Sequence, residues 1–185
     1  MPFTKTDIPG LLVFEPNVFE DSRGYFFESY NEKIFSDAGI DFRWVQDNQS
    51  SSGYGVIRGL HYQLPPFAQS KLVRVLRGKI LDVVVDIRKG SPTFGKSYCK
   101  VLSAKNKKQL FIPAGFAHGF SVLSKNAEVM YKCESYYNKD SEAGILYNDA
   151  ELSIDWMIPA GDVVVSEKDK NLPTLAQCNN SFIFQ

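Results

Sequence analysis

The chain has 185 residues, and its 21 lysines and arginines balance 21 aspartates and glutamates, so the formal net charge is zero. A chain of this length fits one ordinary domain, which we expect to span residues 1–185. The even balance of charges argues against a broad basic surface. We therefore expect neither a nucleic-acid polymer nor a membrane as a partner.

The three cysteines, Cys99, Cys133 and Cys178, lack the paired spacing of a zinc site or a redox motif. We expect them to be free thiols in a reducing compartment. The segment from Met1 to Gly10 lacks the apolar core of a signal peptide, and no window reaches the roughly 20 apolar residues of a membrane span. These features predict a soluble, cytoplasmic protein.

Helical signals are confined to one short segment near the N-terminus. Asn31 can cap a helix that runs to Ala38, Phe35 gives this helix an apolar side, and Gly39 can end it. We expect the helix to be short and peripheral.

Strand signals dominate the middle of the chain. The run Ile80-Leu-Asp-Val-Val-Val-Asp-Ile87 is nearly continuous and rich in β-branched residues, which is typical of a strand buried on both faces. The segment from Lys71 to Arg77 is predicted to be its hairpin partner, with the turn at Gly78. Further glycines separate short apolar runs at intervals typical of antiparallel sheets. The pattern predicts an all-β double-sheet jelly roll with an interior wide enough for a ligand.

The pattern becomes less regular past Asn148. We expect Leu152 to Trp156 to close the sheet and Gly161 to Asp169 to fold back over it. The tail from Cys178 to Gln185 carries no signal that assigns it to an element.

The two histidines lie in strand-like segments beside other polar residues. Pro113-Ala-Gly115-Phe-Ala-His118 matches the second motif of the cupins, so we expect a cupin-type jelly roll. In place of the first motif's His-x-His, the chain has His61-Tyr62-Gln63, and an amide is a poor zinc ligand. Lys71 follows, and its positive charge opposes a metal ion. The pattern favours a site without metal or cofactor, although either histidine alone could be a buried structural residue.

A larger set of motifs extends along most of the chain. The motifs are Phe19-x-Asp21-x-Arg23-Gly24-x-Phe26-x-Glu28, Gln46-Asp47-Asn48, Arg58-Gly-Leu-His61-Tyr-Gln63, Ser91-Pro-Thr-Phe-Gly95, Gly115-Phe-Ala-His118-Gly-Phe and Asn148-Asp149. In their order and spacing, from about Val13 to Asp169, they resemble the dTDP-4-dehydrorhamnose 3,5-epimerase family.

This resemblance implies an enzyme that inverts carbons 3 and 5 of a hexose bearing a ketone at carbon 4. The ketone acidifies both positions because either carbanion is delocalised onto oxygen. The resemblance makes His61 the base and Asp169 its partner. It places Lys71 near the ketone to stabilise the enolate and Tyr131 on the opposite face as proton donor.

The resemblance also implies the substrate, dTDP-4-dehydro-6-deoxy-D-glucose, and a homodimer in which an N-terminal strand is exchanged, so that residues 23–28 serve the partner's site. Asp47 is expected to act by positioning the backbone. The full set of implied substrate contacts is Arg23, Phe26, Glu28, Gln46, Asp47, Asn48, Arg58, Lys71, His118, Glu142 and Lys168.

Three alternatives remain open from the residues. A related dTDP-ketosugar 3-epimerase would share the same catalytic groups. A metal cupin would use His61 and His118 with Gln63 or Glu142 as further ligands. A noncatalytic carbohydrate-binding cupin would keep the pocket but would not need the complete catalytic set.

Overall fold

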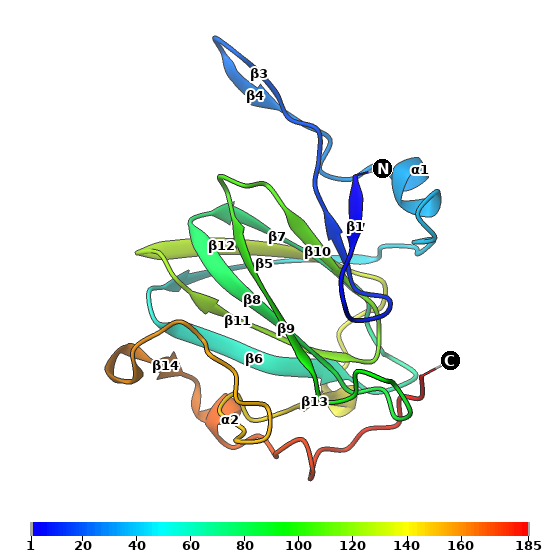
Figure 1. Cartoon of the computed structure of the whole chain (residues 1–185), viewed down its shortest axis with the longest axis vertical. Helices are drawn as coiled ribbons and strands as arrows, with labels where there is room; N and C mark the ends of the chain where they lie inside the picture. Colours follow the sequence, from blue (N-terminus) through cyan, green and yellow to red (C-terminus); the bar gives the residue numbers. More distant parts are fainter. Residues whose placement is uncertain (1, 185) are drawn as a thin grey trace.

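The computed structural model describes residues 2–184 and consists mostly of strands (Figure 1). Two sheets of antiparallel strands pack face to face as a double-sheet jelly roll, which confirms the predicted fold class. Sheet I has the order β1 (Phe3–Lys5), β2 (Leu12–Phe14), β10 (Gln109–Ile112), β7 (Lys71–Arg77), β12 (Asn126–Cys133) and β5 (Gln46–Gly53).

Sheet II has the order β13 (Glu142–Gly144), β6 (Val56–Gln63), β11 (Phe116–Val122), β8 (Lys79–Asp86) and β9 (Ser97–Ser103), and β14 (Val164–Val165) pairs in parallel with β6. From β5 to β13 the chain passes back and forth between sheet I and sheet II, except that β8 and β9 are consecutive strands of sheet II.

Strand β8 is buried on both faces, as its sequence predicts. Ile80 and Val84 face the core between the two sheets, whereas Leu81, Val83 and Val85 face a second core on the outer side of sheet II. Residues 145–182 supply much of the cover on that outer side. The continuous apolar run therefore reflects two cores that share one strand.

The predicted hairpin of β7 with β8 is wrong. Strand β7 pairs with β10 and β12 in sheet I, and β8 pairs with β11 and β9 in sheet II. Gly78, at φ +78°, lies so close to the carbonyl of Asn126 that a Cβ atom would be 2.1 Å from its oxygen. The turn crosses from one sheet to the other, and a local apolar pattern does not distinguish this corner from a hairpin.

The predicted N-terminal helix is confirmed as α1 (Glu32–Ser36). The side chain of Asn31 accepts a hydrogen bond from the backbone N–H of Ile34, and buried Phe35 packs on the outer face of sheet I. Gly39 has φ +81° just beyond the helix.

Two expectations concern the C-terminal part of the chain, and the first is wrong whereas the second is confirmed. The segment from Leu152 to Trp156 forms no strand; both of these side chains instead pack against the outer face of sheet II. Residues 161–169 do fold back, through 3₁₀ helix η2 (Ala160–Asp162), β14 and α2 (Glu167–Lys170). The remaining short helix is η1 (Lys139–Ser141), next to β13.

The tail also packs on the body. The Asn180 amide donates to the carbonyl of Ile87, and the ring of Phe182 lies 6.3 Å from that of Tyr62. Gln185 lies outside the described residues. No helix within residues 2–184 is long and apolar enough to cross a membrane.

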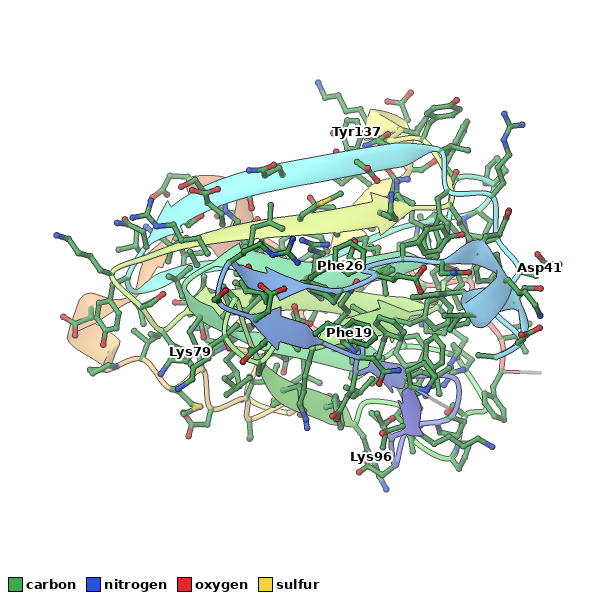
Figure 2. The ribbon with its side chains drawn as sticks, turned by 90° about the horizontal axis from the view of Figure 1, so that it is seen from above. Phe19, Phe26, Asp41, Lys79, Lys96 and Tyr137 are labelled. Atoms are coloured by element: carbon green, nitrogen blue, oxygen red, sulfur yellow. The ribbon has the colours of Figure 1, made fainter. Side chains whose placement is uncertain are left out.

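A two-stranded hairpin projects away from both sheets near the N-terminus (Figure 1). It is formed by β3 (Phe19–Asp21) and β4 (Gly24–Phe26). Figure 2 shows Phe19 and Phe26 on this hairpin, and Tyr137 near the end of the sheet where β5 begins.

Candidate active site

His61 and Asp169 form a pair on the inner side of sheet II. The Nε2 atom of His61 lies 2.7 Å from Oδ1 of Asp169, although the two residues are 108 positions apart. Asp169 is held in α2, where its N–H donates to Oγ of Ser166. Burial opposes ionisation of Asp169, but hydrogen bonds from His61 and Gly59 and nearby positive charges outweigh it, so its pKa lies below the ordinary value.

The backbone around His61 is shaped by two facing glycines. Gly59 has φ +121°, and a Cβ atom there would lie 2.5 Å from the Cα of Gly119 on β11. Its N–H donates to Oδ2 of Asp169 at 3.3 Å. This close approach of β6 and β11 explains the glycine two residues before His61, and it supplies a second anchor for the aspartate.

His118 lies directly opposite His61 in the pairing of β11 with β6. Its Nε2 atom is 3.1 Å and 3.0 Å from the two carboxylate oxygens of Asp82 on β8, and both side chains are buried. The site therefore contains two His–Asp pairs, and the second is held within sheet II.

Lys71 and Tyr131 approach from sheet I. The Nζ atom of Lys71 lies 5.9 Å from the centroid of the Tyr131 ring. Burial lowers the pKa of Lys71, and the nearby Cys133, Asp82 and Glu142 partly offset that effect. Burial also raises the pKa of Tyr131, so its hydroxyl keeps its proton at neutral pH.

These side chains line two adjoining hollows, which together we call the cavity. The inner hollow, of about 220 Å³, is lined by His61, Lys71, His118 and Tyr131 together with Arg58 and Ser50. The outer hollow measures about 130 Å³ and shares His61, Lys71 and Tyr131 with the inner one. Its further lining residues are Gln46, Asn48, Tyr62, Gln63, Gln69, Tyr137 and Glu142.

Charged and polar groups at the outer hollow are tied to one another. Glu142 binds Lys168 at 2.6 Å and accepts a hydrogen bond from the hydroxyl of Tyr137 at 3.0 Å. Burial opposes ionisation of Glu142, but these two partners and further positive charge outweigh it and lower its pKa. Gln46 and Asn48 on β5 bind each other through their amides at 2.9 Å.

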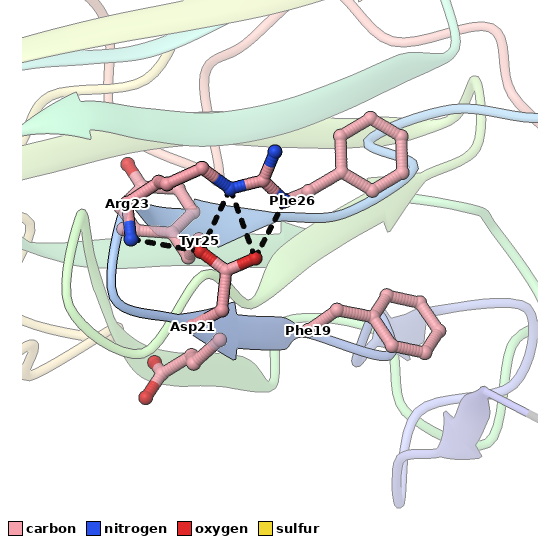
Figure 3. Close-up of a pocket in the computed structure, with 7 residues that line it drawn as sticks. Phe19, Asp21, Arg23, Tyr25 and Phe26 are labelled. Atoms are coloured by element: carbon pink, nitrogen blue, oxygen red, sulfur yellow. Dashed lines mark hydrogen bonds and ion pairs between the residues drawn. The ribbon is translucent and has the colours of Figure 1, made fainter.

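The structure places four of the expected contact residues away from the cavity of their own chain. Asp47 points to the other face of sheet I, where it pairs with Lys132 at 3.0 Å. Arg23 and Phe26 lie on the projecting hairpin, and Glu28 lies just after it and accepts a hydrogen bond from Asn31. Figure 3 shows the hairpin, where Arg23 pairs with Asp21 at 2.6 Å.

The residue that replaces a cupin metal ligand is fully engaged. The Gln63 amide donates to two backbone carbonyls, and its oxygen accepts a backbone N–H from Asn138. Within residues 2–184, no group of three or more histidine, cysteine, aspartate or glutamate residues is arranged to hold a metal ion. Because both ends of its amide are bonded to backbone groups, Gln63 does not fit the role of a cupin metal ligand.

Sequence reasoning missed several lining residues and one buried partner. Asp82 is fully buried beside His118, and an acid in the apolar run of β8 was a signal that could have found it. Ser50, Gln69 and Tyr137 lie in segments whose local pattern gives no such signal.

The chain is similar to known proteins along nearly all of its length. A family model described as dTDP-4-dehydrorhamnose 3,5-epimerase matches residues 5–177. A dTDP-4-dehydrorhamnose 3,5-epimerase of Shigella flexneri is 55% identical over 172 residues, which cover 92% of this chain and 94% of that protein.

Solved structures give the same result. The crystal structure of dTDP-4-dehydrorhamnose 3,5-epimerase from Elizabethkingia anophelis NUHP1 matches with a TM-score of 0.90 and 53% identity, over 93% of this chain and 94% of that one. A dTDP-6-deoxy-D-glucose-3,5-epimerase from Legionella pneumophila, in complex with dTDP-4-keto-L-rhamnose, matches with a TM-score of 0.91 and 48% identity, over 95% and 93% of the two chains.

Proposed function

The chain belongs to the dTDP-4-dehydrorhamnose 3,5-epimerase family, and we propose that its cavity inverts carbons 3 and 5 of dTDP-4-dehydro-6-deoxy-D-glucose. The product is dTDP-4-dehydro-L-rhamnose, and the enzyme is an isomerase. The observation that carries the assignment of residues is their placement: His61 reaches the cavity from sheet II and Tyr131 reaches it from sheet I. Inversion requires a base and an acid on opposite faces of the sugar.

In the first step, His61 removes the proton next to the ketone. Asp169 orients the imidazole and stabilises the imidazolium that forms, and the lowered pKa of Asp169 keeps it ionised for this purpose. A positioned base contributes about 10²–10⁴ in rate, so stabilisation of the developing enolate must lower the barrier further. The Lys71 ammonium supplies this stabilisation at the ketone oxygen.

In the second step, Tyr131 donates a proton to the opposite face of the enolate carbon. Its raised pKa ensures that the proton is present, and an enolate is basic enough to take it. Turnover then requires the two side chains to regain their original protonation states. Gln46, Asn48, Arg58, His118, Glu142 and Lys168 are the expected substrate contacts that lie at or beside this cavity.

Proton NMR in deuterium oxide tests the proposal directly. The protein is incubated with dTDP-4-dehydro-6-deoxy-D-glucose, label is followed at carbons 3 and 5, and the product is trapped with a rhamnose-forming reductase. We expect exchange at both carbons and a reducible product. Label at carbon 3 alone would shift the assignment to a 3-epimerase of the same family, and no exchange would refute it for this substrate.

We also propose that the hairpin serves the cavity of a second subunit in a homodimer. Its support is exposure: the Arg23 side chain is 88% exposed and Phe26 is 68% exposed, although both belong to the expected binding set. Exposed aromatic rings on a projecting hairpin are typical of a surface that a partner covers.

Three free cysteines support a cytoplasmic, reducing location.

Co-expression of two inactive variants tests this exchange. H61N disables the body of one subunit, and R23A disables the hairpin of the other. If the hairpin acts across the interface, the mixed dimer contains one intact site and regains activity. If both groups act within one chain, mixing restores nothing.

A further inference from the structure

Gln63 occupies the sequence position of a cupin metal ligand and lines the outer hollow, yet all of its hydrogen bonds go to backbone groups of two loops. Its Nε2 atom donates to the carbonyl of Phe67 at 2.7 Å and to that of Tyr136 at 3.2 Å. Its Oε1 atom accepts from the N–H of Asn138 at 2.8 Å. Gln63 is only 5% exposed, so these bonds are shielded from water.

The second of these loops carries side chains of the outer hollow. Gln63 binds the residues on both sides of Tyr137, whose ring is exposed and whose hydroxyl donates to Glu142. The N–H of Tyr137 itself donates to the Gln46 side chain. Two side-chain amides, Gln46 on sheet I and Gln63 on sheet II, thus hold the backbone that carries the exposed Tyr137 ring.

We propose that Gln63 is a positioning residue that sets substrate affinity by holding the loop of Tyr136 to Asn138 against the loop of Phe67. This inference rests on the proposed function, which assigns Glu142 to substrate binding. Tyr137 donates to Glu142 and lines the same outer hollow. Gln63 acts through these residues and takes no part in proton transfer. An amide alone meets the requirement, since the position needs two N–H donors and one acceptor at once.

The substitution Gln63→Glu tests the donors at constant size. The carboxylate still accepts from Asn138, but it presents oxygen atoms to two carbonyls that need donors. We expect the Kd for dTDP and the KM for the ketosugar to rise about tenfold to hundredfold, with kcat within about threefold of the wild type. Gln63→Met removes the same bonds without burying a charge and should give a similar but smaller rise.

Asn180 provides a matched control. It is also a buried amide, at 9% exposure, and it also donates to a backbone carbonyl, that of Ile87, and accepts a backbone N–H, that of Phe182. It lies in the C-terminal tail and does not line the cavity. Asn180→Asp should lower the melting temperature while leaving the dTDP Kd of the folded protein unchanged.

The pH dependence separates positioning from general damage. Burial raises the pKa of a carboxyl group, so the Q63E side chain takes up a proton as pH falls and regains one donor. The ratio of its dTDP Kd to that of the wild type should therefore shrink between about pH 8 and pH 5.5, whereas the ratio for Q63M should stay constant.

Two results would overturn the inference. One is a wild-type dTDP Kd in both folded Gln63 variants, and the other is a loss of kcat at saturating substrate with an unchanged Kd. A wild-type protein that binds dTDP but shows no exchange would instead refute the proposed function and leave the binding comparison intact.

Discussion

The two histidines each bind an aspartate, but the two pairs lie in different surroundings. His61 keeps 32% of its side chain exposed at the cavity, and its aspartate arrives on α2 from the C-terminal part of the chain. His118 is only 7% exposed, and Asp82 comes from the adjacent strand of the same sheet. A base needs an open face toward the substrate and a fixed acid behind it. This difference supports the proposal that His61 transfers the proton and that His118 contacts the substrate.

The largest expected difference follows from replacing each imidazole with an amide. H61N should reduce deuterium exchange at carbons 3 and 5 by about 10²–10⁴-fold, because the base is lost, while dTDP binding stays within a few-fold. H118N should mainly raise KM, by about tenfold. NMR exchange and calorimetric titration with dTDP measure both effects. Equal loss of exchange in the two variants would end the distinction between the histidines.

Replacing the aspartates sharpens the same comparison. D169N should lower kcat by about a hundredfold, because an amide favours the wrong tautomer of His61 and cannot stabilise the imidazolium. D82N alters a fully buried group, so it should cost about 1–3 kcal/mol of unfolding free energy and change kcat less. Steady-state kinetics measure kcat, and chemical denaturation measures the free energy of unfolding. A lower kcat for D82N than for D169N, together with a lower stability for D169N than for D82N, would contradict both expectations.

The smallest expected effect is on the pH dependence of stability. The native pKa of Asp169 lies below its ordinary value of 3.8, so the unfolded chain takes up this proton first as pH falls. The stabilisation is complete above that ordinary value and is lost as pH falls through the native pKa. The gap in melting temperature between the wild type and D169N, about a few degrees near neutrality, should therefore close in acid. A gap that widened in acid would reverse the sign.

Local pattern predicted much of the fold. The continuous apolar run of β8 indicated burial on both faces, and Asn31 with Gly39 marked the ends of α1. The same pattern could not show that β7 and β8 belong to different sheets, because a strand's hydrogen-bond partners are long-range contacts. It also could not show that Leu152 and Trp156 are buried without forming a strand.

The candidate site was predicted mainly through motifs, and its assigned roles stay predictions. His61, Lys71, His118 and Tyr131 all line one cavity, as the resemblance implied. Asp82 escaped notice because its partner is 36 residues away and one strand across. The sequence also did not reveal the contacts of Gln63. A motif shows that a metal ligand has been replaced by an amide, but it does not show which backbone groups that amide binds.

The sequence by itself determined which residue types are available, including only two histidines and an amide, Gln63, at the position of a cupin metal ligand. It did not distinguish the partly exposed histidine from the buried one. Tertiary structure decided which groups meet. It brought Asp169 to His61, seated Asp82 beside His118, and set His61 and Tyr131 on opposite walls of the cavity. The physical reason is that these contacts join distant segments across two sheets, where packing rather than local periodicity fixes the geometry.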